Sequence, residues 1–394
     1  MSIYYAIFLV LFCAVIAGFH SKRSILNQGW YVLAALLMIA CAGLRAESVG
    51  ADYGPYRDIF LASPDTLALG FFGQWASTMP AVDVGYVYLN SLIKMVDLPF
   101  EALIFLVALA AVASYALFFW KHARFSAIAL MLYYSHDFFH REMIAIRSGV
   151  AAILILWGFH FWASHRKPMG ITLMVFAVLT HLEAAVVIFP ILMDCLKIKH
   201  TPKFVLATLI GAIIVGNTLN SSYSLFALID RLATYQGSDQ AATLGIFSNP
   251  VTIKQLTILG VLCWLTNSRK DKFSTPIFQL CATSYWMATL WMISFNQFGI
   301  LSARGYSLLG VGEGFIVAQI VASVYEDRNL RRYRRLVSTV VVCYALTTLI
   351  IDLEVKNLVD EYRTTFTYIS FSVWRNGENG PPVRTIHRMP VFTT

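Results

Sequence analysis

Charged side chains are scarce in this chain. Asp, Glu, Lys and Arg make up 13% of its 394 residues, whereas 58% are hydrophobic. Soluble domains carry roughly 25% charged residues, so this shortage excludes an ordinary soluble protein. Strict alternation of apolar and polar residues is also missing. The apolar runs are long and continuous, which favours helices over a membrane β-barrel. The composition therefore predicts a polytopic, all-α membrane protein.

Paired cysteines, internal repeats and low-complexity segments are missing as well. The six cysteines fall inside or beside apolar stretches, as small core residues do, and indicate nothing about the redox compartment. Without a repeat of fixed period, a repeat-built transporter gains no support. The net charge of +8 comes from Lys and Arg beside apolar stretches. It is typical of topology signals, so no nucleic-acid partner is expected.

The apolar stretches predict about twelve transmembrane or re-entrant helices, within a range of about 10 to 13. Residues 1–351 form the expected membrane domain, with polar outer loops at 45–83 and 220–249 and a polar periplasmic tail at 352–394. Lys and Arg cluster in the short loops on one side, which places that side in the cytoplasm and both termini in the periplasm. The stretches taken as single crossings begin near Ile3, Gly29, Leu98, Phe125, Ser148, Phe204, Val251, Pro276, Gly305 and Leu336.

Three segments depart from simple crossings. The stretch between the basic clusters around Arg166 and Lys197 has both ends inside, so it is expected to fold back near Thr180 to Glu183. The run from Gly85 to Val96 is too short and polar to span, and predicts an interfacial helix. The segment HDFFHREMIAIR, residues 136–147, predicts an outer turn.

Several ionisable residues are predicted at one depth, on the outer side. They are Arg45, Arg147, His181, Glu183 and Arg304. Ionisable groups near hydrocarbon are candidates for function, although a single Arg can simply snorkel to the interface. Arginine suits phosphate because its planar fork donates two parallel hydrogen bonds. Arg147 and Arg304 are also expected at helix N-termini, which favour anions. Together they predict a pyrophosphate site.

The polar loop RAESVGADYGPYRDIF, residues 45–60, supplies carboxylates beside aromatic rings. Carbohydrate hydroxyls need acceptors and their C–H faces stack on rings, so Asp52, Tyr53, Tyr56 and Arg57 are candidates for sugar binding. An ordinary aqueous turn is the alternative.

The motif HDFFH resembles the zinc motif HExxH with Asp in place of Glu. On a helix the spacing puts His136 and His140 on one face. A metalloprotease is disfavoured because no persuasive third ligand follows, and the pair is expected instead to line the outer mouth of the site beside Arg141. No metal and no cofactor are expected. His181 is either a structural residue or a proton acceptor, since its ordinary pKa is near 6.5.

As a set, several short motifs resemble the EpsG-like branch of the Wzy-type exopolysaccharide polymerases. They are RAESVGADYGPY at 45–56, DVGY at 83–86, IRSGVA at 146–151, HLEA at 181–184 and ARGY at 303–306. Their order and spacing cover most of the chain up to about residue 325. Where this chain has Asp83, Ser148 and Glu183, family members often have Glu, Gln and a small hydroxyl residue.

The resemblance implies a glycosyltransferase in the bacterial inner membrane that joins oligosaccharide repeat units carried on undecaprenyl diphosphate, at the periplasmic face and without metal. It also implies membrane lipid and a chain-length regulator as partners. The expected catalytic residues are Arg147 and Arg304, which would stabilise the diphosphate, and His181 or Asp52 as the base. The residues expected to bind diphosphate and sugar are Arg45, Tyr53, Tyr56, Arg57, His136, His140, Arg141, Glu183 and Tyr306.

Three other functions stay open. A lipid-linked saccharide flippase would need ionisable residues along a pathway open to both sides. An O-antigen ligase would share the donor chemistry and differ in its acceptor. An acyltransferase acting on surface sugars could use His181, but it gives no reason for three anion-ready arginines.

Overall fold

The computed structural model describes residues 2–20, 25–65, 70–198, 201–221, 249–268, 273–296, 298–359 and 362–365. Most of the expected outer loop 220–249 and of the tail 352–394 lies outside these residues. Within the described part the chain is helical, and its only strand-like pairing is an isolated bridge between Arg45 and Thr364. The all-α prediction is confirmed for this part of the chain.

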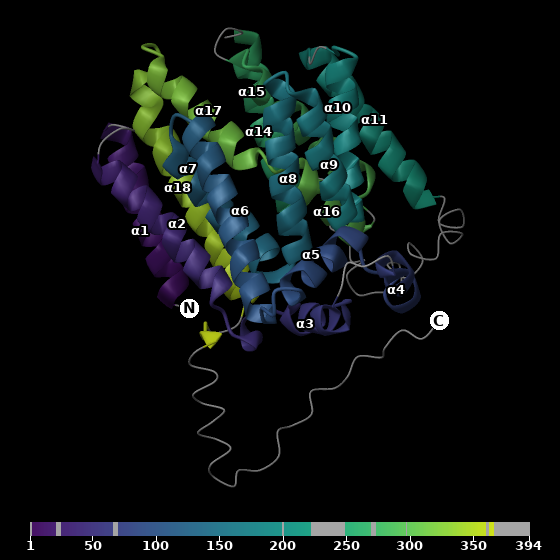
Figure 1. Ribbon diagram of the computed structural model, residues 1–394. Helices are drawn as coiled ribbons and strands as arrows, with labels where there is room; N and C mark the ends of the chain where they lie inside the picture. Colours follow the sequence, from purple (N-terminus) through teal and green to yellow (C-terminus); the bar gives the residue numbers. More distant parts are fainter. Residues whose placement is uncertain are drawn as a thin grey trace.

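The helices pack side by side as a bundle, with a smaller group across one end (Figure 1). Sequence neighbours pair closely, with α1 against α2 and α8 against α9, and α2 also packs against α6, from which three α-helices separate it in the sequence. The principal α-helices are α1 (Ser2–His20), α2 (Ile25–Gly43), α3 (Tyr53–Ala62), α4 (Phe71–Thr78), α5 (Val84–Lys94), α6 (Phe100–His122), α7 (Ser126–Tyr133), α8 (Ile146–Ala163), α9 (Lys167–Thr180), α10 (Ile188–Cys195), α11 (Pro202–Ser221), α14 (Pro250–Ser268), α15 (Pro276–Ser294), α16 (Gly299–Leu309), α17 (Glu313–Glu326) and α18 (Arg334–Ile350). Between or after them lie the short helices η1 (Glu47–Val49), η2 (Tyr134–Ile144), η3 (Leu182–Val187), η6 (Arg331–Tyr333) and η7 (Ile351–Val355).

Twelve crossings are not confirmed. Among the described residues, five helices are long and apolar enough to span a membrane, or six if α16 and α17 form one broken span. They are α1, α2, α6, α8 and the segment from Arg331 to Val355. Several predicted crossings correspond instead to shorter apolar stretches, at Lys167–Thr180 in α9, Pro202–Thr218 in α11 and Pro250–Thr266 in α14. Hydropathy marks an apolar run but does not decide whether it spans, stops halfway or returns.

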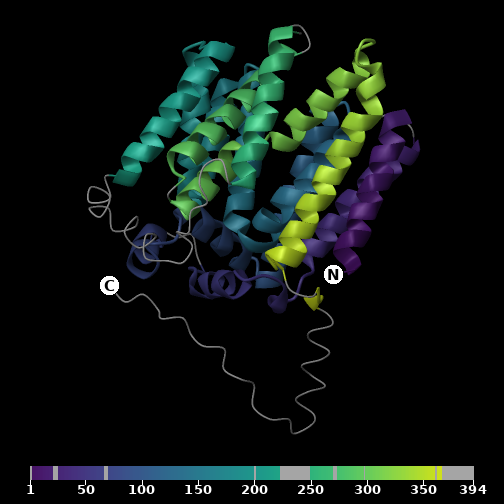
Figure 2. The same ribbon diagram turned by 180° about the vertical axis from the view of Figure 1, so that it is seen from behind.

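One end of the bundle carries most of the irregular backbone. The helices α3, α4 and α5 lie across this end, where α1 begins and α18 ends (Figures 1 and 2). Aromatic side chains hold the group together: Tyr56 and Tyr86 meet edge to face at 5.5 Å between ring centroids, and Phe100 packs against Tyr53. These contacts fix α3 and α5 against the start of α6.

Two predictions of where helices begin and end need correction. The segment HDFFHREMIAIR is not a turn, because residues 134–144 form η2, a π-helix that continues α7. The predicted span beginning at Gly305 starts earlier, at Gly299, and breaks between α16 and α17 with a bend of 52°. A π-helical turn or a helix break leaves backbone N–H and C=O groups that must hydrogen-bond to neighbouring segments. Such irregularities are frequent at functional sites.

The predicted fold-back agrees with the structure. Helix α9 ends at Thr180, His181 is extended, and η3 and α10 follow. The interfacial helix predicted from Gly85 to Val96 corresponds to α5, and Gly85 explains how it can approach the fold-back. A Cβ on Gly85 would lie 2.7 Å from the carbonyl carbon of Leu179, so only glycine permits this contact between backbones.

Candidate functional site

A continuous chain of charged side chains links four separate parts of the sequence at the end covered by α3–α5. Arg147 Nη1 donates to Asp83 Oδ2 at 2.8 Å, and Arg304 Nη1 donates to Glu183 Oε1 at 2.7 Å. His181 lies between the two carboxylates, with Nδ1 3.6 Å from Asp83 Oδ2 and Nε2 3.3 Å from Glu183 Oε2. We call Arg147, Asp83, His181, Glu183 and Arg304 the ion-pair chain.

Local backbone structure places each member of the ion-pair chain. Arg147 is the second residue of α8, as expected of a helix N-terminus. Asp83 precedes α5, and its Oδ1 accepts the backbone N–H of Leu182 at 3.3 Å, so it satisfies a free donor at the start of η3. The position expected for Arg304 is wrong: it lies within α16, which begins at Gly299, and no helix N-terminus supports it.

The ion-pair chain favours a positively charged His181. Burial opposes the charged imidazolium, but the adjacent carboxylates of Asp83 and Glu183 favour it more strongly, so the pKa of His181 is raised above 6.5. Burial would raise the pKa of both carboxyls; however, His181 and the adjacent arginines lower the pKa of Asp83 and of Glu183 instead. The geometry therefore joins two arginines and a histidine, whose charged form is favoured, to two carboxylates.

Arg147 retains a donor for a ligand. Its Nε is buried and has no hydrogen-bond partner, while Nη1 serves Asp83. The guanidinium carbon lies 5.8 Å from the centroid of the Tyr56 ring, which holds the side chain in place. Asp52 lies just before α3, and its carboxyl interacts electrostatically with Arg147 and Arg304. Burial nevertheless dominates and raises the pKa of the Asp52 carboxyl above 3.8.

The other arginines predicted for this site are used elsewhere. Arg45 follows the end of α2, where its side chain is buried, donates to the Ala42 carbonyl and faces the ring of Tyr53. Within the described residues Arg45 makes no ion pair and does not join the ion-pair chain. Arg57 is exposed and pairs with Glu47 at 3.1 Å. Tyr53 is buried in the aromatic group of α3 and α5.

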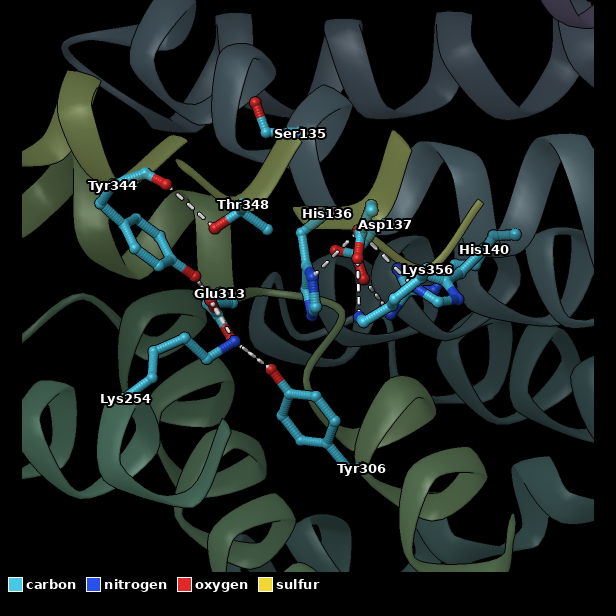
Figure 3. Close-up of polar contacts among 12 residues, drawn as sticks. Ser135, His136, Asp137, His140, Lys254, Tyr306, Glu313, Tyr344, Thr348 and Lys356 are labelled. Atoms are coloured by element: carbon cyan, nitrogen blue, oxygen red, sulfur yellow. Dashed lines mark hydrogen bonds and ion pairs between the residues drawn. The ribbon is translucent and has the colours of Figure 1, made fainter. Parts of the chain in front are cut away.

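The predicted histidine pair belongs to a second polar cluster. His136 and His140 project from η2 toward Asp352 of η7, and Lys356 contacts the same carboxylate at 2.6 Å (Figure 3). Arg141 points away into the protein. It is buried, pairs with Asp137 at 3.0 Å and donates to the hydroxyl of Tyr115 at 2.6 Å. Arg141 therefore anchors η2 to α6.

Tyr306 connects this second cluster to a buried ion pair. Lys254 of α14 donates to Glu313 at 2.9 Å and to the Tyr306 hydroxyl at 2.6 Å, and the Tyr306 hydroxyl donates to Glu313 at 2.6 Å (Figure 3). Glu313 is the first residue of α17, where a negative charge is favourable at the helix N-terminus. This pair ties α14 to the break between α16 and α17.

No grouping of three or more His, Cys, Asp or Glu suited to a metal ion occurs in the described ranges. A cavity of about 510 Å³ lies elsewhere, among α10, α11, α14 and α15. None of the predicted site residues lines it, so the chemistry and this cavity are separate. Its lining includes Asp194, Lys197 and Trp286.

One family model matches this chain, that of the EpsG family, over residues 29–370. The chain belongs to the EpsG family. The match covers both charged clusters, and it is consistent with a polysaccharide polymerase-type membrane protein and with a glycosyltransferase-like enzyme. Searches of curated proteins and of solved structures gave no match.

Within this EpsG-family chain, sequence analysis missed four charged residues, two in the second cluster and two in the adjacent buried ion pair. Lys254 and Glu313 stand inside predicted apolar crossings, and Asp352 and Lys356 follow the last one. The signal was available for the first two, since a charge within a hydrophobic span is rare unless it is paired or functional. Asp83 was noticed only as part of a motif, and nothing in the sequence indicated that it would meet Arg147.

Proposed function

We propose that the protein is a polysaccharide polymerase that joins oligosaccharide repeat units carried on undecaprenyl diphosphate at the periplasmic face of the bacterial inner membrane. The observation that carries this proposal is the ion-pair chain, in which two arginines and a histidine from distant segments meet two carboxylates at one end of the bundle. Membership in the EpsG family supports the same class of reaction.

In this proposal Arg147 and Arg304 bind the diphosphate of the donor. The free Nε of Arg147 offers a donor that Asp83 does not use. A diphosphate would then share the guanidinium groups with the carboxylates, and His181 would add a third positive charge. The same groups stabilise the charge that develops on the diphosphate as its bond to the sugar breaks. Fixed donors of this kind commonly contribute about 10² to 10³ in rate.

We assign the base to Asp52. The two carboxylates beside His181 favour its protonated form, which disfavours it as a proton acceptor, whereas a half-buried carboxylate with a raised pKa suits a general base. A hydroxyl oxygen of the acceptor attacks the anomeric carbon, and its proton passes to Asp52. The bond between that carbon and the diphosphate oxygen breaks, and undecaprenyl diphosphate leaves with the electron pair.

Replacement of Arg147 by Lys tests the proposal. Lysine keeps the charge but loses the planar fork, so a deletion strain complemented with Arg147→Lys should accumulate single repeat units on lipid and lose long polymer. The size distribution of extracted surface polysaccharide and the membrane level of the protein are the measurements. Arg57→Lys, at an exposed ion pair, is the matched control and should restore full-length polymer. Normal polymer length in the Arg147→Lys strain would falsify the assignment.

A further inference from the structure

The second polar cluster combines partly exposed side chains with a buried carboxylate. Its four residues His136, His140, Asp352 and Lys356, which we call the rim cluster, come from η2 and from the end of the α18 segment. The side chains of His140 and Lys356 are 40% and 44% exposed, whereas that of Asp352 is fully buried. A ligand arriving from the surface would meet His140 and Lys356 first and reach Asp352 last.

Two buried polar atoms of the rim cluster face each other without a partner. They are His136 Nδ1 and Asp352 Oδ2, which lie 4.0 Å apart and make no hydrogen bond. His140 Nε2 lies 3.6 Å from the same carboxylate oxygen. These separations exceed the usual 2.7–3.2 Å of a hydrogen bond. Because buried polar atoms are nearly always paired, the arrangement suits an additional polar group that donates to Asp352 and accepts from a histidine.

A sugar hydroxyl is such a group, since it both donates and accepts. Charge argues against an anion, because Lys356 and Asp352 form a pair and offer no surplus positive charge for phosphate. The ring of Tyr306 is buried and lies 6.4 Å from that of His136, between centroids, so it supports the histidine from the protein side (Figure 3).

Helix α16 separates the rim cluster from the ion-pair chain. Arg304 and Tyr306 are two residues apart on this helix, and residues at that spacing do not share a face. Arg304 contacts Glu183 of the ion-pair chain, while Tyr306 lies beside His136. One helix therefore presents a charged side chain to one site and an aromatic side chain to the other.

We propose that the rim cluster binds the neutral saccharide of the acceptor, while the ion-pair chain binds the diphosphate of the donor. This inference rests on the proposed function, in which two glycans must be held at once. Asp352 accepts a hydrogen bond from a sugar hydroxyl, His136 and His140 complete the contacts of that hydroxyl, and the buried ring of Tyr306 supports His136.

Direct binding tests this assignment without requiring catalysis. The probe is an oligosaccharide released from the strain's own surface polysaccharide, free of lipid and phosphate, titrated into the purified full-length protein. Asp352→Asn should weaken binding about 10-fold or more, because hydrogen bonds to charged groups contribute about 1.5–3 kcal/mol. Lys356→Gln, which leaves the carboxylate in place, should weaken binding far less. Glu354→Gln is the matched control and should bind normally. Glu354 is two residues from Asp352 and accepts a hydrogen bond from the Tyr5 hydroxyl.

The outcomes separate this proposal from the polymerase assignment. Arg147→Lys should lose polymer yet bind the free oligosaccharide as the unmodified protein does. Equal binding by Asp352→Asn and the unmodified protein, at equal unfolding temperatures, would overturn the acceptor site and leave the polymerase intact. Competition by inorganic diphosphate against the oligosaccharide would also overturn it, because the rim cluster would then bind anions. Polymer of normal length in the deletion strain would contradict the proposed polymerase function. The binding measurement would still show whether the rim cluster binds saccharide.

Discussion

At the scale of single residues, the functional side chains could be predicted more readily than the side chains that they contact. Arg147, His181 and Arg304 were identified because ionisable groups near a membrane need a reason to be there. Their partners could not be identified in the same way. Asp83 and Glu183 lie 64 and 121 residues from the arginines they bind, and only the packing of α5 and η3 brings them together. The same packing leaves Arg45 turned back on the end of α2.

Protonation of His181 gives a prediction about pH. The pKa of His181 is raised, so its charge is fully present below 6.5 and is lost as pH rises through its higher value in the folded protein. The pKa of Asp52 is also raised, so its basic form is lost as pH falls toward that value. We therefore expect kcat/KM of the purified enzyme to be bell-shaped, with an acidic limb from Asp52 and an alkaline limb from His181.

Substitution of His181 distinguishes the two limbs. His181→Arg keeps a positive charge at every pH and should remove the alkaline limb, whatever its effect on the maximum rate. His181→Ala should lower activity across the whole range, since the two carboxylates would lose their shared cation. An acidic limb that remains in Asp52→Asn would instead mean that neutral His181 is the base.

At the scale of elements, a break could be predicted only where charged residues constrained the direction of the chain. The fold-back at His181 followed from basic residues at both ends of one apolar stretch, a constraint that holds whatever the packing. The start of α16 and the bend between α16 and α17 had no such constraint. The bend is stabilised by Lys254, which reaches Glu313 from another helix, and a single-sequence pattern does not contain that contact. The π-helix η2 was missed because its polar side chains resemble those of an outer loop.

Close contact between α5 and the fold-back gives a prediction that alters no charged group. Gly85→Ala would place a Cβ 2.7 Å from the Leu179 carbonyl carbon and 2.9 Å from the Thr180 nitrogen, so α5 must move away. Asp83 would move with it, and the ion-pair chain would lose its link between Arg147 and His181. We expect a loss of polymer of about 10-fold or more, measured as total long-chain polysaccharide at equal protein level. Gly73→Ala in α4 meets open space and should leave polymer unchanged; equal polymer in both strains would contradict this account.

At the scale of the whole molecule, the distribution of charge was informative and the number of crossings was not. Lys and Arg gather near the ends of α6, α8, α17 and α18 that lie away from the α3–α5 end, where the ion-pair chain and rim cluster are found. Such an imbalance depends on loop composition, which sequence shows directly. Crossing number depends on where each helix ends in the bilayer, and the apolar stretches of α9, α11 and α14 are too short for their composition to decide it.

The orientation itself can be measured with single cysteines. We expect a cysteine replacing exposed Arg57 to react in intact spheroplasts with a maleimide that cannot cross the membrane, because it lies at the end that carries the ion-pair chain. A cysteine replacing Arg328, in the basic segment between α17 and α18, should react only after the membrane is permeabilised. The parent protein has its six cysteines replaced by Ala or Ser, since Cys195 and Cys343 are exposed and would also label. Labelling of the residue 328 variant in intact spheroplasts would invert the orientation, move both clusters to the cytoplasmic side, and leave a periplasmic polymerase without a site.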